Sequence, residues 1–164
     1  MSYLYSSKSL CYNWVMRIQN RKYQREYTVI ETFEAGIALT GAEVKSIRAQ
    51  QLRLDDAFVR IMEDGPYLIN ADIPVYKFAS AKGYQPRRSR KLLLHKKELL
   101  RLKIKLQAAK GLTIVPIACY NKGPLFKLEI GLAKGRTDLE KRKLEKARDI
   151  KRAIDKEIRE YEKY

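Results

Sequence analysis

The chain has 164 residues, the length of one ordinary domain, which can bury a core without disulfides or bound metals. Its 35 lysines and arginines against 19 acidic residues give a net charge of +16, which indicates a polyanionic partner. No apolar run approaches the roughly 20 residues of a membrane-spanning helix, so RNA or DNA is favoured over a membrane. Cys11 and Cys119 lie far apart, which argues against a disulfide framework or a zinc knuckle and favours a reducing, cytoplasmic compartment.

The N-terminal segment differs in composition from the rest of the chain. Residues 1–19 contain no acidic residue and several serines. This composition is typical of a flexible arm that touches RNA and also of an organellar targeting segment, and both interpretations stay open. We expect a flexible arm over residues 1–19, an RNA-binding domain over residues 20–133 and a basic tail over residues 134–164.

A strand and a short helix are predicted next along the chain. Residues 27–39 are rich in β-branched and aromatic residues and are interrupted by Gly36, so we expect one strand with a bend or bulge at that glycine. Thr40 stands three residues before Glu43, which is the spacing of a capping box. A short helix over residues 41–49 should follow.

Two hairpins and a second helix are predicted beyond that point. The hairpins are residues 57–62 with 67–73, around the turn 63–66, and residues 112–120 with 125–133, around the turn 121–124. In the last strand polar residues alternate with apolar ones, so Lys127 should point outward from a buried face. Between the hairpins a helical pattern starts near His95 and runs toward Gly111. This order of elements predicts a mostly β protein, built as a small antiparallel barrel with flanking helices.

The positive charge is concentrated in one segment. Residues 82–111 hold eleven lysines and arginines against one acidic residue. This segment is interpreted as an RNA-binding surface or as a solvated basic loop. The tail over residues 134–164 is amphipathic, and it could pack on its own domain or on a partner, or fold in an RNA groove.

Signatures of catalysis are missing from the sequence. We find no phosphate-binding loop, dinucleotide-binding motif or nucleophile elbow, and a single histidine excludes a two-histidine metal site. His95 itself could be a general base, a helix cap or an RNA contact. We expect no enzymatic activity, no cofactor and no metal.

Five motifs follow one another along the chain. They are NRKYQREYTVIETFEAG (20–36), LTGAEVKSIR (39–48), RKLLLHKKEL (90–99), the pattern KG-T-VP (110–116), and IGLAKG (130–135) with a downstream KR pair (141–142). In order and spacing they resemble the SsrA-binding protein family, also called small protein B. The resemblance implies an antiparallel oligonucleotide-binding barrel (OB-fold) that binds the tRNA-like domain of transfer-messenger RNA. It also implies delivery of that RNA to the decoding centre of stalled ribosomes in trans-translation, by a protein that is monomeric when free. The alternative is a structural ribosomal protein or a general RNA-binding barrel.

The resemblance also implies which residues meet RNA. The family's RNA-facing positions match Glu34, Leu93, His95 and Lys127. A carboxylate such as Glu34 can accept hydrogen bonds from base amino groups, which gives a selectivity that phosphate contacts do not. Arg90 and Lys91 are also expected to contact RNA. Further expected RNA contacts, which could equally support the fold, are Asn20, Arg21, Lys22, Lys45 and Arg48. The tail residues expected to meet ribosomal RNA are Lys134, Arg136, Lys141 and Arg142. The tail departs from the family pattern, because Leu139 and Glu140 replace the aromatic or histidine and the aspartate usual before the KR pair.

Overall fold

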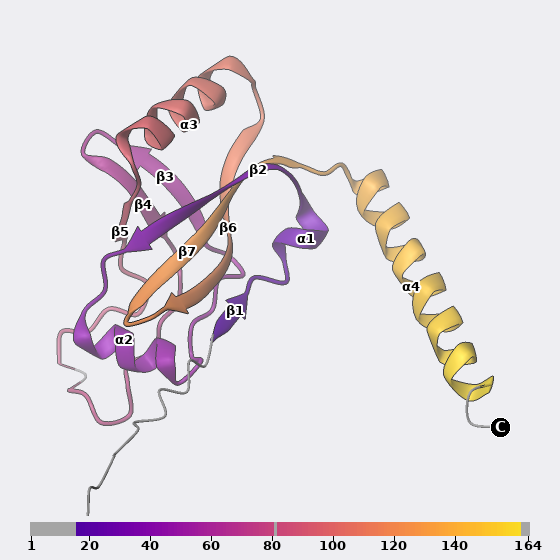
Figure 1. Cartoon of the computed structure of the whole chain (residues 1–164), viewed down its shortest axis with the longest axis horizontal. Coiled ribbons are helices and arrows are strands. Elements are labelled where there is room, and N and C mark those ends of the chain that lie inside the picture. Colours follow the sequence, from indigo (N-terminus) through magenta and orange to yellow (C-terminus); the bar gives the residue numbers. More distant parts are fainter. Residues whose placement is uncertain (1–15, 81, 162–164) are drawn as a thin grey trace, which may run out of the picture.

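The computed structural model describes residues 16–80 and 82–161 and contains seven strands and four helices (Figure 1). In chain order the elements are β1 (Arg17–Gln19), α1 (Tyr23–Glu26), β2 (Tyr27–Ile37), α2 (Gly41–Arg48), β3 (Phe58–Met62), β4 (Gly65–Ile69), β5 (Arg90–Leu93), α3 (Lys96–Ala108), β6 (Leu112–Lys122), β7 (Leu125–Gly135) and α4 (Asp138–Tyr161).

Six of the strands close into a ring. The order β6-β3-β4-β5-β2-β7 returns to β6 through the β6–β7 pairing, and every pair is antiparallel. The short strand β1 pairs with the C-terminal half of β6, beyond its pairing with β3. The prediction of a mostly β protein built on antiparallel strands is confirmed, and the closed ring leaves one outer face on which a binding surface can be built.

The core lies inside the ring and under two of the helices. Phe126, Leu128 and Ile130 are buried at alternate positions of β7, as the sequence pattern predicted. Ile47 of α2 and Leu102 of α3 are fully buried, and Figure 1 shows these helices at opposite ends of the barrel. Burial of such side chains is the main source of stability of a domain this size.

The capping box that the sequence predicted at α2 is present. The Thr40 hydroxyl accepts a hydrogen bond from the Glu43 backbone N–H at 3.4 Å, and the Glu43 carboxylate accepts one from the Thr40 N–H at 2.8 Å. Together the two bonds satisfy donors that a helix start leaves free. The predicted α3 is also confirmed, with His95 at its N-cap position and the His95 N–H donating to Glu98 at 3.1 Å.

Three short elements and several boundaries differ from the sequence prediction. β1, α1 and β5 were not predicted, since three or four residues are too few to show a hydrophobic period. The irregularity in β2 falls at Ile30, between Val29 and Glu31, and not at Gly36. Of the flexible arm expected over residues 1–19, residues 1–15 lie outside the described part of the chain, and residues 17–19 form β1. β7 extends to Gly135, two residues past the predicted end of the domain.

The basic tail forms a helix that projects from the barrel (Figure 1). An ion pair of 2.8 Å between Arg25 of α1 and Glu145 of α4 ties the helix to the domain. Leu144 of α4 is half-buried, whereas the other large apolar residues on either side of it are exposed: Leu139, Ile150, Ile154, Ile158 and Tyr161. The apolar stripe therefore does not pack on the barrel. No helix in the described part of the chain is both long and apolar enough to cross a membrane.

Candidate nucleic-acid interface

One row of cross-strand neighbours runs over five strands of the sheet. Arg17 lies opposite Tyr120, Tyr120 opposite Lys127, Lys127 opposite Gly36, and Gly36 opposite Leu93. Directly opposed residues point to the same face of an antiparallel sheet. The row therefore joins the two chain regions that the sequence linked to RNA, around residues 127 and 93, on one surface.

A groove of about 440 Å³ opens along this row and contains the four RNA contacts that the family resemblance implied. Glu34 comes from β2, Leu93 from β5, His95 from the N-cap of α3 and Lys127 from β7. The other lining residues are Gly36, Ile37, Leu94, Glu98, Leu125 and Phe126. Four side chains separated by up to 93 positions in the chain thus share one site.

The Glu34 carboxylate is the electrostatic centre of the groove. It accepts a hydrogen bond from the Tyr120 hydroxyl, and the Nζ atoms of Lys127 and Lys122 lie 3.5 and 3.8 Å from it. The Tyr120 hydrogen bond, aided by these two lysines, lowers the pKa of Glu34 below its ordinary value. Glu34 therefore presents a negative charge at neutral pH. Partial burial and the bond to Glu34 raise the pKa of Tyr120 to about 12, so its hydroxyl stays a donor.

The remaining walls of the groove are mostly apolar, with Glu98 as a second acidic residue. Leu93 and Leu125 expose 61% and 62% of their surface, an unusual degree for leucine in a folded domain. Exposed apolar side chains beside the Glu34 carboxylate and its two lysines can pack on bases, accept from base amino groups and pair with phosphates. No group of three or more His, Cys, Asp or Glu side chains that could hold a metal occurs within residues 16–80 and 82–161.

A second hollow continues the groove toward α2. It has a volume of about 340 Å³ and shares Phe126 with the first groove, and Arg48 lines its α2 side. Lys45, one turn earlier on the same helix, is also exposed. Of the additional basic residues predicted to contact RNA, Arg48 therefore lines the second hollow and Lys45 is exposed on the same helix.

Three other predicted contacts are exposed but lie outside both hollows. Arg21 is exposed on the surface before α1. Lys22 is exposed and forms an ion pair of 2.6 Å with Asp56, and Lys91 forms one of 3.1 Å with Asp64. Ion pairs this exposed contribute little to stability, so each lysine can leave its carboxylate and bind a phosphate instead.

Asn20 and Arg90 need a different assignment from the predicted one, because both are buried. The Asn20 amide donates to the carbonyls of Leu54 and Pro116, each at 3.0 Å. The Arg90 guanidinium is fully buried and donates to the carbonyls of Ala71 and Pro86, each at 2.7 Å. Their polar groups are occupied within the protein, so we assign both residues to the fold and not to the RNA surface.

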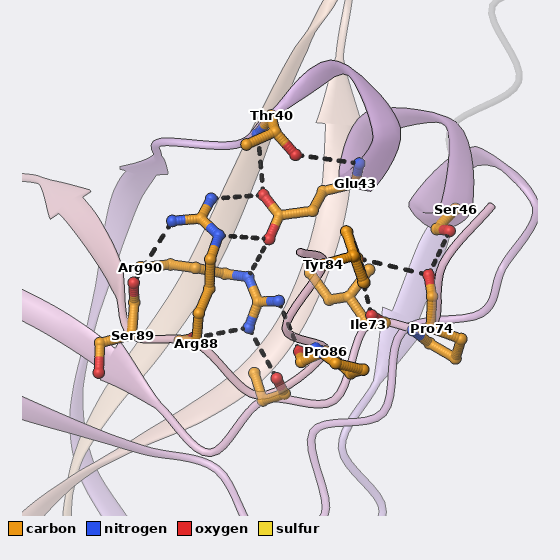
Figure 2. A network of polar contacts seen from close by, with 11 residues as sticks. Thr40, Glu43, Ser46, Ile73, Pro74, Tyr84, Pro86, Arg88, Ser89 and Arg90 are labelled. Atoms are coloured by element: carbon orange, nitrogen blue, oxygen red, sulfur yellow. Dashed lines mark hydrogen bonds and ion pairs between the residues drawn. The ribbon is translucent and has the colours of Figure 1, made fainter. Parts of the chain in front are cut away.

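Arg90 belongs to a buried ionic network centred on Glu43 (Figure 2). Arg88 donates to the Glu43 carboxylate through Nε at 2.8 Å and Nη2 at 2.6 Å, and Arg90 Nε donates to it at 2.9 Å. Burial alone would raise the pKa of Glu43, but the Arg88 and Thr40 hydrogen bonds and the two arginine charges outweigh it and lower the pKa. The network ties α2 to β5, the strand that carries Leu93 into the groove.

The four tail residues predicted to meet ribosomal RNA differ in the contacts that they make within the protein. Lys134 and Arg142 are exposed, whereas Lys141 lies 3.3 Å from Asp138. Arg136 donates to the Thr28 hydroxyl at 2.9 Å and to the Gln24 carbonyl at 2.5 Å, so it fixes the start of α4 against the barrel.

Glu140, which departs from the family pattern, has a local structural role. Its carboxylate accepts from the Thr137 N–H at 2.8 Å, and its own N–H donates to the Thr137 hydroxyl at 3.4 Å. This is the reciprocal pair of a capping box, formed here at the start of α4. The substitution therefore stabilises the helix at its first turn.

Sequence reasoning missed three residues of the groove region: Tyr120, Lys122 and Leu125. The actual turn of the last hairpin is Gly123-Pro124, two residues shorter than predicted. The shorter turn places Tyr120 opposite Lys127, where a four-residue turn would have placed it opposite Leu125.

Comparison with known proteins places this geometry in one family. The model of the family described as SmpB protein matches residues 17–160. The chain is 48% identical over 140 residues to the SsrA-binding protein of Sulfurihydrogenibium sp. (strain YO3AOP1), covering 85% of this chain and 91% of the relative. It is 46% identical over 136 residues to that of Lactobacillus acidophilus, covering 83% and 89%. A solved chain described under "tmRNA-SmpB: a journey to the center of the bacterial ribosome" is 44% identical, with a TM-score of 0.62 over 74% of this chain and 85% of that one.

Proposed function

This chain belongs to the SmpB protein family, and we propose that it is an RNA-binding adaptor for transfer-messenger RNA in trans-translation. It binds the tRNA-like domain of that RNA and delivers it to stalled ribosomes in the cytoplasm, without changing the RNA chemically. Its relatives are named SsrA-binding proteins, and its solved relative is described with transfer-messenger RNA and the ribosome. The observation that carries the proposal is the assembly of Glu34, Leu93, His95 and Lys127 in one groove.

The two charged side chains Lys127 and Glu34 recognise different parts of the RNA in the groove. Lys127 supplies a cation for a phosphate, while Glu34 accepts hydrogen bonds from base amino groups. A carboxylate costs affinity for a polyanion unless cations surround it, and Lys122 and Lys127 do so here. Leu93 and Leu125 provide the apolar surface against which a base or sugar packs.

The tail carries the second contact, with the ribosome. Lys134 lies near the end of β7, and Lys141 and Arg142 lie in the first two turns of α4. All three are outside the groove, and they meet ribosomal RNA. Because α4 projects from the barrel, the two RNA surfaces are held apart on one chain (Figure 1). Arg136 sets the direction of the helix through its bonds to α1 and β2.

A competition titration at near-physiological salt tests the proposal. Labelled tRNA-like domain of transfer-messenger RNA is bound to the full chain and challenged with excess bulk tRNA and duplex RNA. An adaptor retains the labelled RNA. A general RNA-binding barrel, the competing function, loses it to any competitor, because its affinity comes from phosphate charge alone.

We expect Glu34→Gln to weaken binding of the tRNA-like domain about tenfold. Loss of a charge-assisted hydrogen bond to a base costs on the order of 1.5–3 kcal/mol. Charge alone predicts the opposite sign, since removing a carboxylate should strengthen binding to a polyanion. The dissociation constant of the variant, measured by titration at fixed salt, therefore separates the two mechanisms.

Two further variants test whether the effect of Glu34→Gln is due to base recognition and not to charge alone. Glu63→Gln neutralises an exposed carboxylate in the β3–β4 turn and should show only the small gain in affinity due to charge. Lys127→Ala should weaken binding and reduce the slope of log affinity against log salt by about 1, as expected for one lost phosphate contact. If Glu34→Gln binds as tightly as Glu63→Gln, base recognition by Glu34 is wrong.

A further inference from the structure

An aromatic turn beside α2 lies outside the groove described above. We propose that it is a second RNA-binding site, at which an unpaired base stacks on Tyr76 and Phe78 while Lys45 and Lys77 hold the adjoining phosphates. This site rests on the proposed function of binding RNA. It adds a class of ligand that the groove does not define, a single-stranded segment recognised by stacking.

The turn presents its aromatic side chain to solvent. The Ala79 N–H donates to the Tyr76 carbonyl at 2.8 Å, which closes a tight turn with Lys77 and Phe78 at its tip. Phe78 exposes 80% of its surface, and its ring meets that of Tyr76 edge to face at 5.7 Å between centroids. A phenylalanine held this far out of the core contributes little to stability, and its ring is accessible to a ligand.

The turn is held against α2 by polar contacts. The Ser46 hydroxyl donates to the Pro74 carbonyl at 2.6 Å, and the Tyr84 hydroxyl donates to the Ile73 carbonyl at 2.8 Å (Figure 2). Lys45 of α2 lies over the Tyr76 ring, with its Nζ 5.8 Å from the centroid. The platform is therefore fixed in place before a ligand arrives, which lowers the entropic cost of binding.

Positive charge surrounds the aromatic pair. Lys77 Nζ lies 5.7 Å from the centre of the Phe78 ring, and Lys45 and Arg48 are exposed on the adjoining helix. None of these three cations forms an ion pair with another residue in the described ranges of the chain. Exposed aromatic rings beside unpaired cations are the combination that binds single-stranded nucleic acid, because every base has a face that stacks.

The turn is also continuous with the groove. Arg48 lines the hollow that shares Phe126 with the groove, and Lys45 lies one helical turn before Arg48. One RNA strand can therefore pass from Lys127 through this hollow, past Arg48 and Lys45 of α2, to Phe78. This continuity favours RNA over a protein partner at the turn.

The test is a binding titration of the full chain with a short single-stranded RNA carrying the fluorescent base 2-aminopurine, and in parallel with the tRNA-like domain. We expect Phe78→Ala to bind the single-stranded RNA roughly tenfold or more weakly, which corresponds to a base–aromatic stacking energy of about 1–3 kcal/mol. The variant should also lose the quenching of 2-aminopurine fluorescence that stacking on the ring produces. Phe78→Tyr keeps the ring and should bind as the parent does. Leu100→Ala, which truncates another exposed apolar side chain on α3, should leave both signals unchanged.

The outcomes separate this inference from the proposed function. Parent-like binding and quenching by Phe78→Ala, with Lys127→Ala weakened, would overturn the stacking site and leave the groove standing. An equal loss in Phe78→Ala and Leu100→Ala would also overturn it. If the unsubstituted chain shows no preference for transfer-messenger RNA, yet quenching of the single strand depends on Phe78, the proposed function fails and the stacking site holds.

Discussion

Glu43→Gln should lower the free energy of unfolding by about 3–5 kcal/mol, the range measured when one partner of a buried ion pair is removed. The substitution keeps the size of the side chain but removes the charge that compensates Arg90, whose guanidinium has no access to water. The two carboxylate oxygens of Glu43 accept hydrogen bonds from Arg88 and Arg90. In the glutamine variant one of these oxygens becomes an amide NH2 group, which donates and does not accept. Urea denaturation followed by circular dichroism measures the loss.

A matched control separates this buried network from charge pairs in general. Asp64→Asn removes the carboxylate that pairs with Lys91 at 3.1 Å on the surface and should leave stability close to that of the parent, because exposed ion pairs contribute little. Equal stability of Glu43→Gln and Asp64→Asn would show that the network is not what holds α2 to β5.

Acid should destabilise the protein through the same carboxylate. The pKa of Glu43 lies below its ordinary value of 4.5 in the folded protein, so the unfolded chain takes up a proton there more readily. The resulting stabilisation is fully present above pH 4.5 and is lost as the pH falls through the folded-state pKa. The unfolding free energy of the parent should therefore drop more steeply below pH 4.5 than that of Glu43→Gln, and parallel curves in urea titrations across this range would contradict it.

The elements that sequence reasoning predicted are those whose signals are local. Alternation in β7 placed Lys127 outside the core, and the Thr40–Glu43 spacing predicted the start of α2. Both patterns depend only on the period of a strand or on the first turn of a helix. The family resemblance then supplied the groove residues, which alternation alone does not select.

What the sequence did not predict depends on pairing between distant segments. β5 alternates buried and exposed positions, but a buried position holds Arg90 and an exposed one holds Leu93. The buried arginine is explained by Glu43 and the backbone carbonyls that accept from it, which come from distant segments. The same network occupies the Arg90 guanidinium within the protein, which its sequence context does not indicate. Tyr120 was missed because the hairpin turn is two residues shorter than predicted, which changes the residue opposite Lys127.

Truncation after Gly135 should abolish ribosome rescue but leave the affinity for the tRNA-like domain within about twofold of the parent. A lost contact worth about 1.4 kcal/mol would weaken binding tenfold, so a twofold change means that no such contact is lost. The cut leaves β7 complete, and the groove residues all precede it. What it removes is α4 with its contacts to the barrel, the Arg25–Glu145 ion pair and the Arg136 hydrogen bonds. Peptide tagging on stalled ribosomes in a reconstituted system measures rescue, and tagging by the truncated chain would refute the division between groove and tail.

The truncated chain also provides a second readout, inhibition of tagging by the full chain, in addition to its own loss of rescue activity. If it binds the tRNA-like domain normally but fails on the ribosome, it should compete with the full chain and inhibit tagging in proportion to its share of the total protein. Lys141→Ala with Arg142→Ala in the full chain should reproduce part of this inhibition, because the helix stays in place but two of its cations are removed. A truncated chain that is inactive and does not inhibit would mean that α4 contributes to binding transfer-messenger RNA itself, and the two surfaces would then act as one.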